Sequence, residues 1–214
     1  MLTIKRAKKP FANSPLPCAP YYGFFEYNMH QLAQIVEETP RSPELEQDVG
    51  HMQLVTYVLV VTETGHIAHY SRGTGDSRLV AKRSVGFGGH VENYSDLPEK
   101  TAEHFEDHLY SEARRELIEE LNIPLWGGPE WLRRVGWIGD GTDAVGRVHL
   151  GALFVAKVKA EELEMAQRNS EIEDLQLGTY HDLQDMQATQ LEGWSQIVVN
   201  VMKLVYPPVV GSDE

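Results

Sequence analysis

The chain is poor in cysteine, in long apolar runs and in basic charge. Cys18 is the only cysteine among 214 residues, which excludes an internal disulfide and a cysteine-rich zinc site. Apolar runs such as Val58 to Val61 are far shorter than the roughly 20 residues of a membrane helix. The basic residues near the N-terminus precede prolines rather than the apolar core of a signal peptide. We therefore expect a soluble, cytoplasmic protein.

The shortage of basic residues also restricts the partners. The chain has 32 acidic and 19 basic residues, a net charge of −13. Nucleic-acid phosphates require a basic footprint, so a general nucleic-acid binder is excluded. An anionic small molecule would need a cation to bridge it to an acidic surface. The length and a hydrophobic content of 42% suffice for a globular core without disulfides or a structural metal.

Proline marks off the beginning of the chain. We divide it into an N-terminal extension over residues 1–50 packed on the main domain, a main domain over 51–206 and a tail over 207–214. Six prolines interrupt the extension: Pro10, Pro15, Pro17, Pro20, Pro40 and Pro43.

The rest of the chain alternates strand-like and helix-like patterns. β-Branched and alternating apolar residues predict strands at Met52–Val61, Ile67–Tyr70, Arg134–Ile138, Val148–Val158 and Ile172–Tyr180. Helical patterns cover about Met29–Glu37, Glu161–Gln167 and Trp194–Leu204, and a strong central helix runs from Glu99, or at least His104, to Leu121. Asn122 is the expected cap of that helix. These elements indicate a mixed α/β class.

The central helix carries an acidic face. In Arg115-Glu116-Leu117-Ile118-Glu119-Glu120, the three glutamates fall at positions i, i+3 and i+4. Like charges at this spacing repel each other. A hard divalent cation with oxygen ligands, Mg²⁺ or Mn²⁺, would make the arrangement favourable. Upstream, Gly86-Phe87-Gly88-Gly89 indicates unusual backbone angles or a close backbone approach.

Together these segments resemble the signature of the Nudix hydrolase family. The second half is matched by Arg115, Glu116, Leu117, Glu119, Glu120 and Ile123, and the start by Gly88, Gly89 and Glu92. Asn122 replaces the usual glycine, and asparagine tolerates the left-handed conformation needed there. The stretches Ser84–Val91 and Val145–Gly151 look like a MutT-like subgroup described as predicted phosphoesterases.

The resemblance implies a fold and a reaction. The fold would be an α/β/α sandwich with a mixed sheet. The reaction would be metal-dependent hydrolysis of a pyrophosphate bond in a nucleoside diphosphate derivative. Glu116 and Glu120 would be the principal Mg²⁺ or Mn²⁺ ligands, with Glu119 beside them and the Gly88 carbonyl as a further oxygen. Arg115 would orient the glutamate face, which makes Glu116, Glu119, Glu120 and Arg115 the catalytic set.

Substrate contacts are expected next to the segment Gly86–Gly89, the glycine loop. Gly89 is a candidate, and Arg72, Arg78, Lys82 and Arg83 precede the loop, where Arg78 and Arg83 in particular are placed to meet phosphates. A basic strand edge explains the same residues almost as well. A later acid often completes such sites, and Glu171 and Glu173 are candidates.

The spacing departs from the family pattern. About a dozen extra residues lie between Glu92 and Arg115, which predicts an insertion inside the signature. The partner of Arg115 is left open among Asp107, Glu106, Glu103 and Glu112, and Glu92 or Asp107 takes the family's middle glutamate position.

Other readings remain open. A catalytically silent Nudix-like module would bind a nucleotide or a partner protein and serve a regulatory role. An allylic diphosphate isomerase would need a cysteine, but Cys18 lies in the proline-rich leader. His104 and His108 have the i, i+4 spacing of a zinc peptidase without its glutamate placement. His90 and His149 are more typical of hydrogen-bonded strand or loop histidines. The N-terminal segment is also placed to pack across a homodimer.

Overall fold

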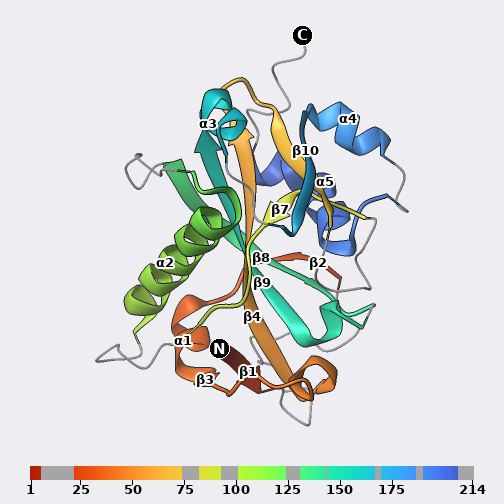
Figure 1. The fold of residues 1–214 in the computed structure, drawn as a ribbon. Helices are drawn as coiled ribbons and strands as arrows, with labels where there is room; N and C mark the ends of the chain where they lie inside the picture. Colours follow the sequence, from red (N-terminus) through yellow and green to blue (C-terminus); the bar gives the residue numbers. More distant parts are fainter. Residues whose placement is uncertain are drawn as a thin grey trace.

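Helices cover both faces of a twisted mixed sheet in the computed structural model of the chain (Figure 1). The structure describes residues 1–5, 22–73, 82–92, 101–123, 131–142, 144–166, 170–186 and 190–206. The proline-rich leader with Cys18, the candidate Arg78, the loop 93–100 and the tail 207–214 lie outside these ranges. The insertion predicted in the signature therefore stays a prediction.

The main path of the sheet has the order β10-β5-β4-β9-β8-β2. These strands are β10 (Ile172–Gly178), β5 (Ile67–Arg72), β4 (His51–Thr62), β9 (His149–Val158), β8 (Leu132–Asp140) and β2 (Tyr22–Phe25). β4 and β9 run parallel, in register from Gln53 opposite His149 to Thr62 opposite Val158. The other neighbours along this path are antiparallel. The mixed sheet expected from the sequence is confirmed.

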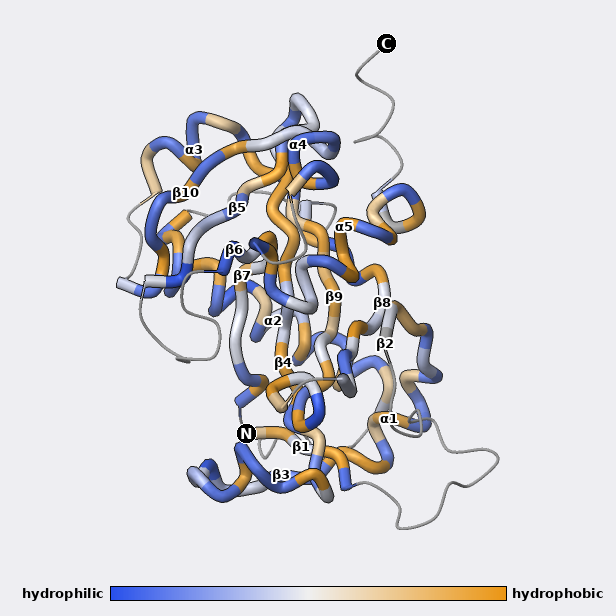
Figure 2. The backbone as a smooth tube through the Cα atoms, turned by 90° about the vertical axis from the view of Figure 1, so that its right-hand side faces the viewer, coloured by the Kyte–Doolittle hydropathy of each residue, from blue (hydrophilic) through white to orange (hydrophobic). Residues whose placement is uncertain are grey.

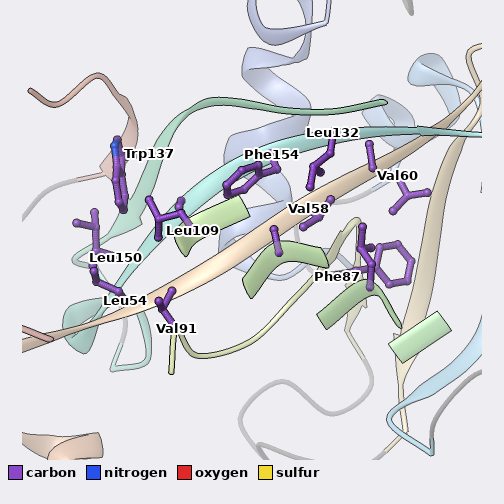
Figure 3. Close-up of a cluster of buried hydrophobic side chains, with 14 of the residues drawn as sticks. Leu54, Val58, Val60, Phe87, Val91, Leu109, Leu132, Trp137, Leu150 and Phe154 are labelled. Atoms are coloured by element: carbon purple, nitrogen blue, oxygen red, sulfur yellow. The ribbon is translucent and has the colours of Figure 1, made fainter. Parts of the chain in front are cut away.

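Two separate cores flank β4 because successive side chains of a strand point to opposite faces. Leu54 and Val58 belong to the core beneath α2 (Ala102–Leu121), which also receives Leu109 and Phe154 (Figure 3). Tyr57, Leu59 and Val61 belong to the core beneath α4 (Tyr180–Asp185) and α5 (Gly193–Val205). A central strand covered on both faces is apolar almost throughout, and Figure 2 shows hydrophobic residues along β4.

The central helix α2 begins and ends at recognisable caps. The Thr101 hydroxyl accepts a hydrogen bond from the His104 amide, and Asn122 adopts the left-handed conformation at φ 48°. Sequence and structure agree on the end at Leu121, and the helix begins at Ala102. Glu112 and Glu120 lie on its buried side together with the apolar residues.

The first residues of the chain join the same sheet. β1 (Leu2–Lys5) pairs with β4 and with β3 (Val36–Glu38), and β2 pairs with β8. The core beneath α2 fully buries Leu2 and Ile4 of β1 and Leu32 of α1 (Met29–Ile35). The expected helix in this region is confirmed, whereas its strands were not predicted because three or four residues show no clear periodicity.

Short elements connect the rest: η1 (Leu45–Gln47), β6 (Arg83–Ser84), β7 (Gly86–Phe87), η3 (Gly146–Val148) and α3 (Ala160–Glu164). β7 pairs with β4 and β6 pairs with β5, which places the glycine loop across the centre of the sheet. No helix in the described part of the chain has both the length and the apolar character needed to span a bilayer.

Candidate active site

A cavity of about 670 Å³ lies between the glycine loop, α2 and the start of α5. Its wall includes the predicted set: Gly88, Gly89, Arg115, Glu116, Glu119 and Glu120. The tertiary structure therefore brings both halves of the sequence signature to one surface. Its volume is within the range typical of small-molecule sites.

The two glycines bring backbone against the acidic face of α2. Gly88 has φ +147°, and a Cβ there would lie 2.1 Å from the Thr56 carbonyl oxygen. Its amide donates a 2.8 Å hydrogen bond to Glu120 Oε2. At Gly89 a Cβ would lie 2.7 Å from Glu116 Oε1. Only residues without a side chain allow this approach.

Arg115 ties the acidic residues together. Its Nη2 donates to Glu116 Oε1 at 2.6 Å and to Glu112 Oε2 at 2.9 Å, and Nη1 donates to Glu119 Oε2 at 2.9 Å. Nη2 also donates to the His90 carbonyl at 3.1 Å. The planar guanidinium holds several carboxylates at once in a rigid fork, a geometry that the compact ammonium of a lysine lacks.

The partner of Arg115 that the sequence left open is Glu112. Glu112 Oε2 also accepts a hydrogen bond from the Glu92 amide at 2.8 Å, so it joins α2 to the residues that follow the glycine loop. Glu106 instead accepts from Arg134 Nε at 2.7 Å. Asp107 and Glu103 are exposed. The i, i+3 spacing of Glu112 and Arg115 was the available signal, but four acids shared this stretch of helix.

Burial raises the pKa values of Glu116 and Glu120. Desolvation raises the pKa of Glu120 to about 8, further increased by repulsion from Glu116 and opposed by the charge of Arg72. Desolvation also raises the pKa of Glu116, against the charge of Arg115. Uncompensated negative charge is thus costly at this wall, and a cation would relieve the cost.

A buried hydrogen-bond network holds the positively charged side chain of Arg72 at the cavity wall. Arg72 Nε donates to Glu192 Oε2 at 3.1 Å. Glu192 Oε1 accepts from the Tyr57 hydroxyl at 2.9 Å and from Ser84 Oγ at 2.7 Å. Arg72 and Glu192 both line the cavity. Sequence reasoning missed Glu192, which stands alone before Gly193 without a motif.

Of the other candidates, only some line the cavity. The Arg83 guanidinium donates to His69 Nδ1 and Asp174 Oδ2, each at 2.8 Å, and Arg83 is not among the residues lining the cavity. Of the two late acids, Glu171 lines the cavity and Glu173 does not. His108 Nε2 lies 2.7 Å from the Glu92 carbonyl oxygen, in the hydrogen-bonded role of an ordinary helix histidine.

Comparisons with known proteins agree with this geometry. Protein YmaB of Bacillus subtilis (strain 168) is 31% identical over 165 residues, which cover 76% of this chain and 77% of YmaB. The crystal structure of Tm1382, a candidate Nudix hydrolase, matches with a TM-score of 0.63 and 26% identity over 87% of this chain and 91% of Tm1382. The chain belongs to the Nudix hydrolase superfamily.

More distant structures share the Nudix fold alone. DR0079 from Deinococcus radiodurans matches with a TM-score of 0.55 and 16% identity over 86% of this chain and 98% of its own. A MutT protein from Methanosarcina mazei Go1 matches with a TM-score of 0.51 and 17% identity, covering 72% and 94%. No family model matches the chain. The resemblance inferred from the sequence is confirmed at the level of the superfamily.

Proposed function

We propose that this Nudix protein hydrolyses a pyrophosphate bond in a nucleoside diphosphate derivative, using Mg²⁺ or Mn²⁺. The observation that carries the proposal is the placement of two carboxylates, the half-buried Glu116 and the buried Glu120, beside Gly88 and Gly89 at the wall of a cavity. Buried acids that lie together favour a bound cation over solvent.

The donor set fits a hard divalent ion. Glu116 and Glu120 would hold it, with Glu119 and the Gly88 carbonyl as further oxygen donors. All are oxygen ligands, which Mg²⁺ and Mn²⁺ prefer. Burial has raised the pKa of Glu120 to about 8, so a nearby cation would favour its ionised form. A bound ion of this kind would neutralise phosphate charge and make water a better nucleophile.

The residues of the chain supply orientation and charge. Arg115 holds Glu116 and Glu119 in fixed positions through hydrogen bonds of 2.6 and 2.9 Å. Gly89 allows its backbone to lie directly beside the Glu116 carboxylate, in the space that the Cβ of any other residue would take. Arg72, held by Glu192, presents a positive charge to the diphosphate. In this proposal Arg72 takes the phosphate-binding role for which the sequence favoured Arg78 and Arg83.

The aromatic wall suits the nucleoside part. Trp194 and Tyr57 both line the cavity, with ring centroids 5.6 Å apart in an edge-to-face arrangement. Aromatic faces commonly stack on nucleobases. We propose that Trp194, the less buried of the two, contacts the base while the acidic wall faces the diphosphate.

The test is phosphate or nucleotide release from a panel of nucleoside diphosphate derivatives, with and without Mg²⁺ or Mn²⁺. Wild type is compared with Glu116→Gln/Glu120→Gln, and with Glu103→Gln, an exposed glutamate of the same helix, as the matched control. We expect turnover that requires the metal and that only the double substitution abolishes. Unchanged turnover in the double variant would reject the proposal, and tight nucleotide binding without turnover under any metal would favour the silent module.

A further inference from the structure

Two histidines from distant parts of the chain meet at another wall of the same cavity. His90 follows β7, and His149 begins β9, yet their Nε2 atoms lie 3.3 Å apart and their ring centroids 5.3 Å apart. Both rings line the cavity. The nitrogen atoms, rather than the carbon edges, face each other. This arrangement differs from the stacking or edge contacts of packed aromatic rings.

Glu46 of η1 completes a group of three. One ligand atom from each of Glu46, His90 and His149 lies within 4.8 Å of the others. Glu46 also lines the cavity. A carboxylate and two imidazoles form a common three-residue ligand set for Zn²⁺, which leaves a fourth position for water or substrate.

The two rings differ in how their Nε2 atoms are engaged. His149 Nδ1 lies 2.7 Å from the Val145 carbonyl oxygen, so Nδ1 carries the hydrogen and Nε2 presents a lone pair. Such a bond from the second ring nitrogen to a backbone carbonyl fixes the tautomer in most histidine metal sites. His90 Nε2 lies 2.9 Å from Gln53 Oε1, so in the ion-free state it carries the hydrogen. Binding an ion there moves that hydrogen to Nδ1, and the ring stays neutral.

The distance between the two nitrogens matches a tetrahedral ion. With metal–nitrogen bonds of about 2.05 Å and a tetrahedral angle, two ligands are separated by about 3.3 Å. The observed separation is 3.3 Å. The spacing of the two nitrogens therefore suits a tetrahedral ion, which would replace the hydrogen bond between His90 Nε2 and Gln53. A hydrogen bond between the two rings alone would not require a carboxylate oxygen of Glu46 within 4.8 Å of both.

We propose that Glu46, His90 and His149 bind a transition-metal ion of the Zn²⁺ class, separate from the Mg²⁺ or Mn²⁺ held by the glutamates of α2. Imidazole ligands select Zn²⁺ and its neighbours, whereas all-oxygen sites select Mg²⁺ and Mn²⁺. The ion joins η1, the segment after β7 and the start of β9. It would thus hold these three segments together at the cavity wall and leave one coordination position open to water or a ligand. This proposal does not depend on the hydrolytic reaction.

The test uses Co²⁺ and Zn²⁺ binding to the full chain in excess Mg²⁺, which keeps the glutamates of α2 occupied. Co²⁺ in a tetrahedral nitrogen-containing site absorbs visible light far more strongly than in an octahedral oxygen site. The variants are His90→Ala, His149→Ala and Glu46→Gln. His51→Ala, a half-buried histidine bonded to Asp48 and not among the cavity-lining residues, is the matched control.

We expect one equivalent of strongly absorbing Co²⁺ in wild type, in His51→Ala and in Glu116→Gln/Glu120→Gln. Each of the three ligand variants should lose at least about tenfold in affinity for Co²⁺ and Zn²⁺. Equal affinity in the ligand variants, loss confined to Glu116→Gln/Glu120→Gln, or no absorbing complex in wild type would each overturn the proposal.

A measurement on wild type alone guards against misfolded variants. Imidazole nitrogen NMR follows each ring during Zn²⁺ addition. Two Nε2 resonances should shift together at one equivalent, and a hydrogen should appear on Nδ1 of His90. Two unchanged rings would overturn the site even if all the variants were unfolded. Loss of turnover in the diphosphate assay would leave these results untouched, so the two proposals fail independently.

Discussion

The substitution Gly89→Ala should displace the Glu116 carboxylate at the candidate active site while leaving the stability of the fold nearly unchanged. The new Cβ would lie 2.7 Å from Glu116 Oε1, and ordinary contact begins at 3.4 Å, so the carboxylate must move by 3.4 − 2.7, about 0.7 Å. The atoms in the way are the end of a side chain, which moves more easily than backbone. Gly89 is not among the glycines with positive φ, so alanine fits its backbone.

The expected result is loss of function without unfolding. A misplacement of about 1 Å in a catalytic group costs on the order of 100-fold in rate, so a shift of about 0.7 Å should cost tens of fold. Mn²⁺ affinity should fall by about tenfold, because Glu116 leaves its place beside Glu120. The free energy of unfolding should stay within about 1 kcal/mol of wild type.

The assays are turnover on the best diphosphate of the panel, Mn²⁺ calorimetry and urea unfolding. Gly50→Ala is the control, since its Cβ would lie 2.9 Å from Asp48 Oδ1, a carboxylate that does not line the cavity. This variant should keep full turnover and Mn²⁺ affinity. A folded Gly89→Ala protein with wild-type turnover and Mn²⁺ affinity would refute the reasoning.

Four further outcomes test the roles of Gly88, Glu192 and Glu120. Gly88→Ala should destabilise the fold by more than about 2 kcal/mol in urea unfolding, because φ is +147° and the Thr56 carbonyl cannot yield, and a wild-type midpoint would contradict this. Glu192→Ala should cost about 3 kcal/mol, because it leaves Arg72 at the cavity wall without its carboxylate partner, and Glu192→Gln should cost less. Without metal, stability should fall as pH rises from about 4.5 to about 8, because folded Glu120 holds its proton longer than the unfolded chain, and Glu120→Gln should flatten that slope. Mn²⁺ affinity should rise over the same range, since the ion competes with that proton; a pH-independent affinity would contradict the assignment.

The long elements were predictable because their patterns are strong. β4 and β9 carry dense apolar and β-branched residues, and α2 repeats its apolar positions over five turns with Asn122 as its cap. Short strands such as β1 and β3 were not predictable, because three or four residues carry no clear periodicity and are defined as strands only by the neighbours they pair with. Helix α4 was missed for a similar reason, as its six residues carry little periodicity.

The site was predictable only in part. The glutamates of the signature were found because residues three or four apart on a helix lie on one face. The two glycines were found because clustered glycines indicate unusual backbone angles or a close backbone approach. The choice of Glu112 over Asp107 for Arg115 depends on which side of α2 faces the glycine segment. The role of Glu192 depends on contacts more than a hundred residues away.

The sequence by itself determined the class of fold, the family and the acidic helix face, because these depend on local periodicity and on spacing within one segment. Only the tertiary structure decided that Arg72 rather than Arg83 faces the cavity, and that His90 meets His149. Such pairings depend on strand register and chain crossing. Burial, which raises the pKa of Glu120, likewise exists only once distant segments have packed around it.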